Sequence, residues 1–201
     1  MAKKKIIAKT SPKKEYKKNI KKFNFKTFYN SKIQPLLPVL KFTGIFLFIV
    51  GCYYAFITSD YKEIMRGYLA LTAKISSFLL NLLGEDTIAR SQIINSARGS
   101  ISIGFGCDGL DPIVIFFAAA VATPTKWLYK IVGIVLSALI LYFFNFVRII
   151  GLFYIRIKWI EIFDPMHFEI FPVFFIILSI VLYALWQYFV LKKRRTINEI
   201  T

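Results

Sequence analysis

Three side chains of this sequence, Cys107, Arg148 and His167, are together suited to nucleophilic chemistry on a carbonyl group. A cysteine thiolate attacks carbonyl carbon. A histidine near its ordinary pKa can carry the thiol proton, and an arginine supplies charge and N–H donors for an oxyanion. Each lies at or near the end of a hydrophobic segment, and a count of those segments places all three on one side of a membrane. The sequence therefore predicts chemistry at a lipid–water boundary.

Taken singly, each of these residues has a simpler interpretation. An arginine at a helix end is usually an anchor whose charge reaches the interface along an apolar stem. A lone histidine or cysteine is more often structural than catalytic. Asn145, one helical turn before Arg148, is equally suited to a hydrogen bond between two membrane helices. The convergence of all three on one face is what favours chemistry.

The composition is that of a membrane protein. Hydrophobic residues make up 57% of the 201 residues and are gathered in blocks, whereas a soluble domain is typically about 45–50% apolar. The net charge of +16 is concentrated at the ends of the chain. Residues 1–32 carry twelve lysines against Glu15, and residues 192–201 carry four basic residues against one acidic residue. Basic groups therefore flank the apolar segments, as the positive-inside rule requires.

These basic tails are expected to bind membrane lipids. No motif with groove or stacking geometry accompanies them, so we expect no nucleic-acid partner. We divide the chain into a basic cytoplasmic arm (residues 1–32), a membrane-embedded domain (33–191) and a basic cytoplasmic tail (192–201).

About four transmembrane helices are predicted, over residues 36–57, 110–123, 127–147 and 171–191. The second is short for a span, and the third can continue to Lys158. An even number of spans leaves both termini in the cytoplasm. The segments 59–111 and 148–169 are nearly neutral, with five basic against six acidic residues and three against three. They are therefore expected outside, which places the site on the extracytoplasmic face of the plasma membrane.

Residues 61–83 differ from the predicted spans. Apolar residues recur there at spacings of three and four, and charged residues such as Lys62, Arg66 and Lys74 fall largely on another side. This pattern indicates an amphipathic helix that lies on the membrane or packs across the other helices, with Gly84 suited to its end. The alternative is a poor fifth span, which would reverse the side of everything downstream.

The only strand signal lies between residues 85 and 106. Residues 92–95 and 100–105 flank a turn-like segment, which predicts a short extracytoplasmic hairpin leading to Cys107. Residues 161–169 are predicted to be a loop because they contain Asp164 and Pro165. If that loop forms a helical turn, Asp164 can orient the imidazole of His167.

The fold class is therefore an all-α integral membrane protein with one amphipathic helix and a short hairpin. We expect no cofactor. We also expect no metal, because one histidine and one exposed cysteine fall short of a zinc site. The second cysteine, Cys52, lies inside an apolar segment and is interpreted as a small buried hydrophobic residue.

Three short motifs resemble the exosortase/archaeosortase family. They are Cys107-Asp108-Gly109-Leu110 at the head of a span, Asn145-Phe146-Val147-Arg148-Ile149 at the end of the next, and His167 before the last. The resemblance covers roughly residues 61–191. It implies an integral membrane cysteine transpeptidase or protease whose catalytic cysteine, arginine and histidine correspond to Cys107, Arg148 and His167.

This chain departs from the family in two ways. The family often has serine after the cysteine, where this chain has Asp108, whose carboxylate raises the thiol pKa unless Arg148 offsets it. The chain is also short, which indicates a compact branch.

The resemblance implies a substrate as well. It is a secreted protein that ends in a short motif, a spanning helix and a basic tail, which the enzyme processes at the outer face. Two alternatives are an accessory protein for membrane assembly or secretion, in which the three residues are structural, and a small transporter component with Arg148 and His167 along a polar path.

Overall fold

The computed structural model describes the chain from Gln34 to Ile200 except residues 59–61 and 105. The predicted basic arm, residues 1–32, lies outside the described residues. The chain divides into two units, Met1–Leu37 and Pro38–Thr201. Of the first unit, only the 3-10 turn η2 (Gln34–Leu36) and the first residue of the following helix are described.

Three stretches of helix are long and apolar enough to cross a membrane. They are Gln34–Ile57, Trp127–Lys158 and Ile160–Lys193. The first consists mainly of α2 (Leu37–Thr58), the second is α5 (Trp127–Lys158), and the third contains most of α7 (Phe171–Ile200). Helix α5 continues past Arg148 to Lys158, an extension that the hydrophobic pattern permitted.

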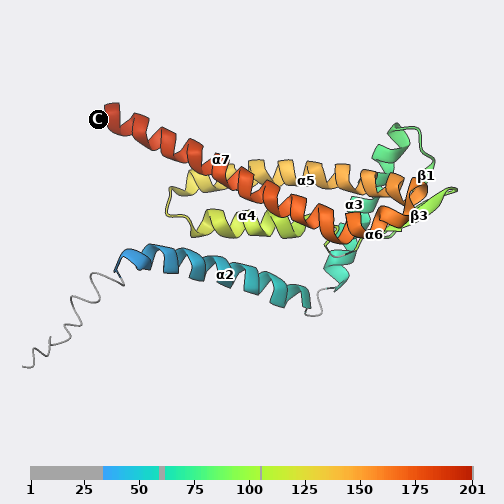
Figure 1. Ribbon diagram of the computed structural model, residues 1–201, viewed down its shortest axis with the longest axis horizontal. Coiled ribbons are helices and arrows are strands. Elements are labelled where there is room, and N and C mark those ends of the chain that lie inside the picture. Colours follow the sequence, from blue (N-terminus) through green and yellow to red (C-terminus); the bar gives the residue numbers. More distant parts are fainter. Residues whose placement is uncertain (1–33, 59–61, 105, 201) are drawn as a thin grey trace, which may run out of the picture. The chain divides into compact units, whose positions relative to one another are not determined.

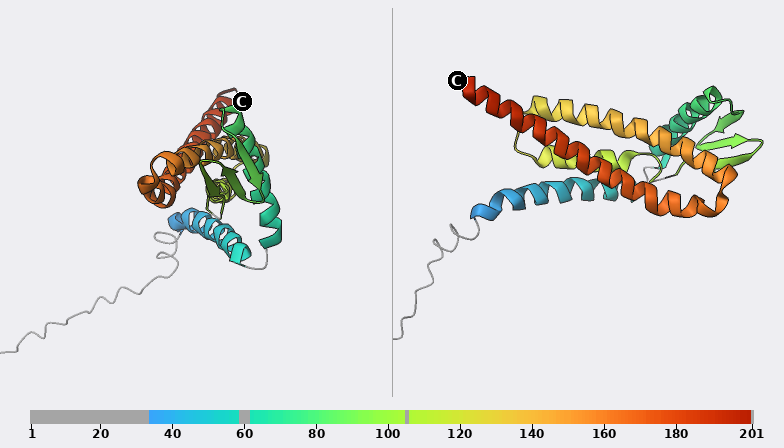
Figure 2. Two further views of the ribbon diagram at one scale, coloured as in Figure 1. Left: turned by 90° about the vertical axis from the view of Figure 1, so that its right-hand side faces the viewer. Right: turned by 45° about the horizontal axis from the view of Figure 1, so that its top comes forward.

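The second predicted span, over residues 110–123, is a shorter apolar helix, α4 (Leu110–Ala122). Its 13 residues reach about 20 Å, less than the roughly 30 Å of a bilayer core. It runs alongside part of the helical bundle and ends near the start of α5 (Figure 1). From there α5 returns and α7 crosses back (Figures 1 and 2).

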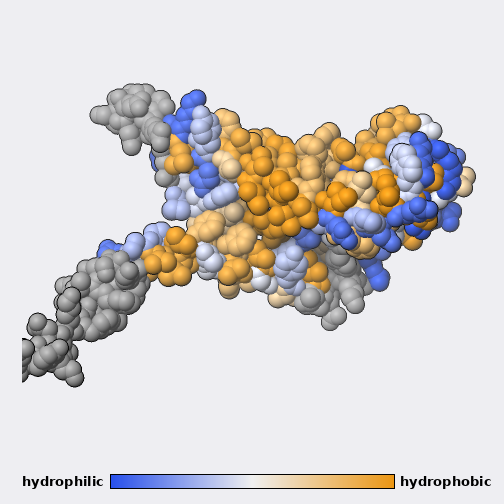
Figure 3. Space-filling view, viewed as in Figure 1, coloured by the Kyte–Doolittle hydropathy of each residue, from blue (hydrophilic) through white to orange (hydrophobic). Residues whose placement is uncertain are grey.

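Helices α4, α5 and α7 pack against one another along this bundle. The buried side chains of their shared core are Phe116, Ala120, Leu141 and Phe175. Many other large apolar side chains of α5 and α7 remain exposed, including Leu139, Phe143 and Ile177. Figure 3 shows apolar residues across the middle of the described helices and hydrophilic patches toward both ends. An uncovered apolar belt of this size is expected where lipid is the solvent. The chain is a mostly helical membrane protein, as predicted.

The amphipathic segment forms helix α3 (Lys62–Leu82), which does not belong to the three candidate spans. Its apolar side, with Leu69, Ala73 and Leu80, is buried in a core that α3 shares with α5 and a small sheet. The helix ends at Leu82, and the turn after it contains Gly84, whose φ of +88° is a conformation that glycine adopts at little cost. The predicted packing of α3 across other helices is thus observed.

The sheet has three antiparallel strands in the order β1-β2-β3. They are β1 (Thr87–Arg90), β2 (Ile93–Ser96) and β3 (Gly99–Ser102). The predicted hairpin is the β2–β3 pair, in which Ile94 lies opposite Ile101. Strand β1 was not predicted. It is joined to α3 because Ser77 and Asn81 donate to the carbonyl of Thr87 and the Thr87 N–H donates to Oδ1 of Asn81.

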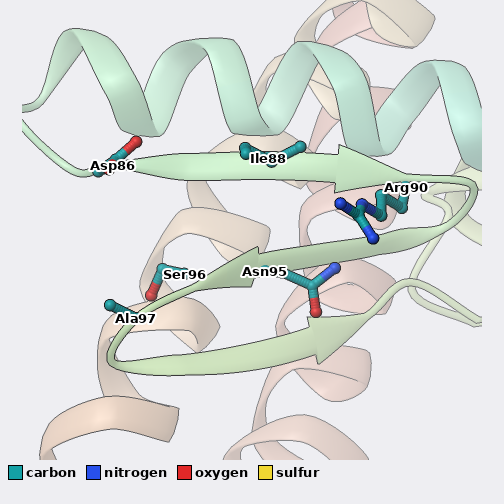
Figure 4. Close-up of a pocket in the computed structure, with 6 residues that line it drawn as sticks. All are labelled: Asp86, Ile88, Arg90, Asn95, Ser96 and Ala97. Carbon is teal, nitrogen blue, oxygen red and sulfur yellow. The ribbon is translucent and has the colours of Figure 1, made fainter.

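The outer face of this sheet is polar and shallowly hollowed. Figure 4 shows Arg90 and Asn95 on adjacent strands beside a pocket of about 310 Å³. Its lining residues all belong to the segment from Asp86 to Ala97, so it is separate from the cysteine, arginine and histidine singled out above.

The prediction of a loop over residues 161–169 is wrong. The segment is helical throughout, as η3 (Ile160–Ile162), α6 (Phe163–Pro165) and a π-helix, η4 (Met166–Ile170). Pro165 lies in the first turn of α6, where a missing N–H costs no intrahelical hydrogen bond. The proline therefore does not break the helical path into α7.

Candidate functional site

The candidate nucleophile lies in a tight segment between β3 and α4. The backbone N–H of Cys107 donates to the carbonyl of Gly104 at 3.1 Å. Gly106 and Gly109 both have a φ of +80°, which other residues rarely adopt. A Cβ on Gly109 would lie 2.8 Å from Cγ of Asn145. The conformation and the space at Gly109 therefore both require glycine, and they bring Cys107 close to α5.

His167 lies beside Cys107, although 60 residues separate them in the chain. The Cys107 sulfur is 3.2 Å from Nδ1 and 3.4 Å from Nε2, so both ring nitrogens lie within contact distance of it. Phe163 stacks on the imidazole with centroids 5.5 Å apart, and Phe168 meets it edge-on at 4.4 Å. His167 is held by the π-helix η4, a kind of helix that is frequent at functional sites.

Arg148 of α5 joins the two segments that carry Cys107 and His167. Its Nη1 donates to the carbonyl of Gly106 at 2.8 Å, and its Nη2 donates to the carbonyl of His167 at 3.3 Å. The side chain is only 4% exposed, and its guanidinium lies 5.7 Å from the ring centres of Phe171 and Phe175. Its Nε is buried without a hydrogen-bond partner. One N–H donor of the guanidinium thus remains unused inside the site.

Asn145 and Asp108 are also part of this arrangement. The fully buried amide of Asn145 donates to the carbonyl of Cys107 at 3.2 Å, and its Oδ1 has no partner. The carboxylate of Asp108 accepts the N–H of Leu110 at 3.2 Å and so satisfies a free donor at the start of α4. Two of the three predicted supporting residues, Asn145 and Asp108, therefore lie beside Cys107.

Burial raises the pKa of the Cys107 thiol above its ordinary value. The positive charge of Arg148 opposes this rise, and the Asp108 carboxylate adds to it. Arg148 therefore offsets the rise only in part, and the isolated thiol is protonated at neutral pH. Burial also raises the pKa of Asp108 to about 6.

Asp164, the third predicted supporting residue, does not make the contact with His167 that was predicted for it. Its segment does form helical turns, but the side chain is exposed, and no hydrogen bond among the described residues joins it to His167. Instead, Phe163 stacks on one face of the imidazole and Phe168 packs perpendicular to it. Phe163 was missed in the sequence, although its spacing of four from His167 would have indicated a contact had the segment been predicted helical.

An apolar hollow of about 280 Å³ lies beside Arg148. It is lined by α5, α7 and η4, with Phe144, Met166 and Phe174 among its walls. Within the described residues, no group of three or more His, Cys, Asp or Glu side chains is placed to hold a metal ion.

The fold and the site together define a helical membrane protein with a cysteine, a histidine and an arginine gathered at one end of its bundle. Residues 37–184 match the family model described as transmembrane exosortase, Exosortase_EpsH, and the chain belongs to this family. Comparisons with curated proteins and with solved structures find no match to this chain.

Proposed function

We propose that this protein is a membrane cysteine peptidase or transpeptidase that cleaves C-terminal sorting signals of secreted proteins at the outer face of the plasma membrane. Membership of the exosortase family supports membrane sorting-signal processing as the general activity. The observation that carries the chemical proposal is the contact of the Cys107 sulfur with both ring nitrogens of His167.

The reaction starts with the thiol, because its raised pKa leaves it protonated in the resting protein. As the sulfur attacks the carbonyl carbon of the substrate, the thiol proton passes to His167. The new C–S bond pushes the carbonyl electron pair onto oxygen. Arg148 retains an unpartnered Nε–H, which can donate to that oxyanion.

His167 then returns the proton to the leaving amine, and the C–N bond breaks. This step leaves a thioester on Cys107. Water or an acceptor amine or hydroxyl attacks the thioester, and the thiol is restored. Arg148 also positions the reacting groups, because its two terminal nitrogens bind the backbone on either side of the site.

The proposed substrate is a secreted protein that ends in a short motif, a spanning helix and a basic tail. The three helices able to cross a membrane support a location in which enzyme and substrate share the bilayer. Their encounter is then confined to two dimensions, and the peptide bond to be cleaved lies close to the membrane surface.

The test is to trap the thioester. The protein is reconstituted in proteoliposomes with a reporter that ends in such a signal, quenched in acid, and digested for mass spectrometry of the Cys107 peptide. A hydroxylamine-labile adduct on Cys107, absent in His167→Ala, is expected. Cleavage of the reporter by Cys107→Ala at the wild-type rate would refute the proposal.

A further inference from the structure

Three consecutive carbonyl groups of the cysteine-bearing loop are each held by a different side chain. Arg148 binds the carbonyl of Gly106 at 2.8 Å, and Asn145 binds that of Cys107 at 3.2 Å. The hydroxyl of Tyr68 donates to the carbonyl of Asp108 at 2.8 Å. The first two donors come from α5, and the third comes from the amphipathic helix α3. Side chains from two helices thus fix three successive peptide planes around the thiol.

We propose that Tyr68 is a positioning residue for Cys107. Its hydroxyl holds the carbonyl of Asp108, one residue after Cys107 in the chain. Arg148 holds the carbonyl of Gly106, one residue before Cys107. This inference rests on the proposed function for its effect on catalysis, but not for its effect on the thiol itself.

The surroundings of Tyr68 favour a fixed orientation. Its ring is half-buried and lies 6.3 Å from the ring of Tyr142. Thr72, one turn later in α3, donates to the backbone carbonyl of Tyr68 at 3.0 Å and contacts the Tyr142 hydroxyl at 3.2 Å. The aromatic packing holds the ring, so its hydroxyl can act on the loop without first being ordered at an entropic cost.

The hydrogen bond from Tyr68 matters because Asp108 directly follows Cys107, so the position of its peptide group affects the position of the sulfur. Gly106 and Gly109 flank Cys107 and Asp108, and glycine leaves the backbone freer than any other residue does. Without anchors, a loop hinged by two glycines would sample many positions of the thiol. The contact between Cys107 and His167 requires one of them, and an error of about 1 Å can cost about 10²-fold in rate.

The experiment compares Tyr68→Phe with Tyr142→Phe. Each substitution removes one tyrosine hydroxyl from the same aromatic cluster, but only Tyr68 touches the loop. The first measurement is the rate of Cys107 alkylation by iodoacetamide against pH, in a Cys52→Ala background, which needs no substrate. We expect Tyr68→Phe to react at least threefold faster at neutral pH, with the midpoint displaced downward, because a freed loop exposes a thiol whose pKa is raised by burial. We expect Tyr142→Phe to match the parent protein.

The second measurement uses the sorting-signal reporter. We expect kcat to fall about tenfold in Tyr68→Phe, equivalent to about 1.4 kcal/mol, with KM within twofold. A purely structural role would lower the melting temperature and the active fraction without displacing the alkylation midpoint. Equal midpoints and equal kcat in the two variants would overturn the inference. If the reporter is cleaved by no variant but the alkylation midpoints differ, the proposed function fails and the positioning role stands.

Discussion

The sulfur of Cys107 and the imidazole of His167 are in contact, at 3.2 Å to Nδ1 and 3.4 Å to Nε2. Two different parts of the fold create this contact. A glycine-flanked loop delivers the thiol at the head of α4, and the π-helix η4 delivers the imidazole before α7. Because the sulfur lies within 3.4 Å of both nitrogens, either one is close enough to receive the thiol proton.

The two cysteines should differ completely in their importance. We expect Cys107→Ala to abolish reporter cleavage and Cys52→Ala to leave it within twofold of wild type. Cys52 lies on an exposed part of α2, not buried as the sequence indicated, whereas Cys107 is 4% exposed beside His167. The check is reporter processing at matched protein levels. Equal losses in both variants would remove Cys107 as the nucleophile.

The topology can be tested with single cysteines in a background that lacks Cys52 and Cys107. Ser91, between β1 and β2, and Glu161, in η3, are both exposed. We expect cysteines at both positions to react with a membrane-impermeant maleimide in intact cells. A cysteine in place of the exposed Lys126, in the α4–α5 connection, is the cytoplasmic control and should react only after lysis. The reverse pattern would place the site inside.

Asp108 should make the protein less stable as the pH rises. Its folded-state pKa is raised from 3.8 to about 6, so its contribution to stability is greatest when protonated and is lost as pH rises through about 6. Asp108→Asn stays neutral and keeps an oxygen for the N–H of Leu110. We expect the variant to gain up to about 3 kcal/mol over wild type at pH 7.5, from about 1.36 kcal/mol per pKa unit.

The same substitution tests the effect of Asp108 on the thiol. The carboxylate raises the pKa of Cys107, so Asp108→Asn should lower it and speed alkylation at neutral pH. The advantage in stability should shrink at pH 5. Unfolding in detergent at the two pH values, followed by intrinsic fluorescence, measures it. A constant difference between pH 5 and 7.5 would contradict the assignment.

Much of this architecture is encoded in simple patterns. The hydrophobic blocks located α2, α5 and α7, and the spacing of apolar residues located α3 almost to the residue. The helical conformation of residues 160–170 was not predicted, because Asp164-Pro165 is a pair typical of loops. Proline is nevertheless tolerated in a first helical turn. Strand β1 has four residues, too few to show a clear alternation.

The candidate site also contains residues that the sequence could predict and one that it could not. Cys107, Arg148 and His167 could be selected because their residue types and their positions relative to spans are visible in the sequence. Tyr68 could not. Its spacing places it on the apolar stripe of α3, and nothing local shows that its hydroxyl reaches a carbonyl 40 residues further along the chain. Hydrogen bonds between distant segments depend on the packed fold, which periodicity does not reveal.

Gly109 should tolerate no side chain. It has a φ of +80°, and an added Cβ would lie 2.8 Å from Asn145, which is fully buried and cannot move aside freely. We expect Gly109→Ala to cost about 1–3 kcal/mol in stability and to abolish reporter cleavage. Gly84→Ala is the matched control, because its φ is +88° but its Cβ would meet open space. Similar losses in both variants would show that backbone strain alone accounts for the effect.

Arg148→Lys should be severely impaired although it keeps the positive charge. The guanidinium binds the carbonyls of Gly106 and His167 with two nitrogens and keeps Nε–H free, a planar geometry that one ammonium group cannot reproduce. If that free donor binds the oxyanion, its loss should reduce the cleavage rate by about 10²–10³-fold. An arginine that is only an interfacial anchor would be replaced by lysine with little effect.

The matched control is Arg156→Lys, in the same helix. Arg156 is exposed and lies 5.3 Å from the ring of Phe163, without the two backbone contacts of Arg148. We expect this control to cleave the reporter within twofold of wild type, since lysine also retains a cation near the ring. The measurement is the initial cleavage rate in proteoliposomes that contain equal amounts of each variant. An Arg148→Lys variant within about threefold of wild type falls far short of the cost of a lost donor, and would exclude Arg148 from oxyanion binding.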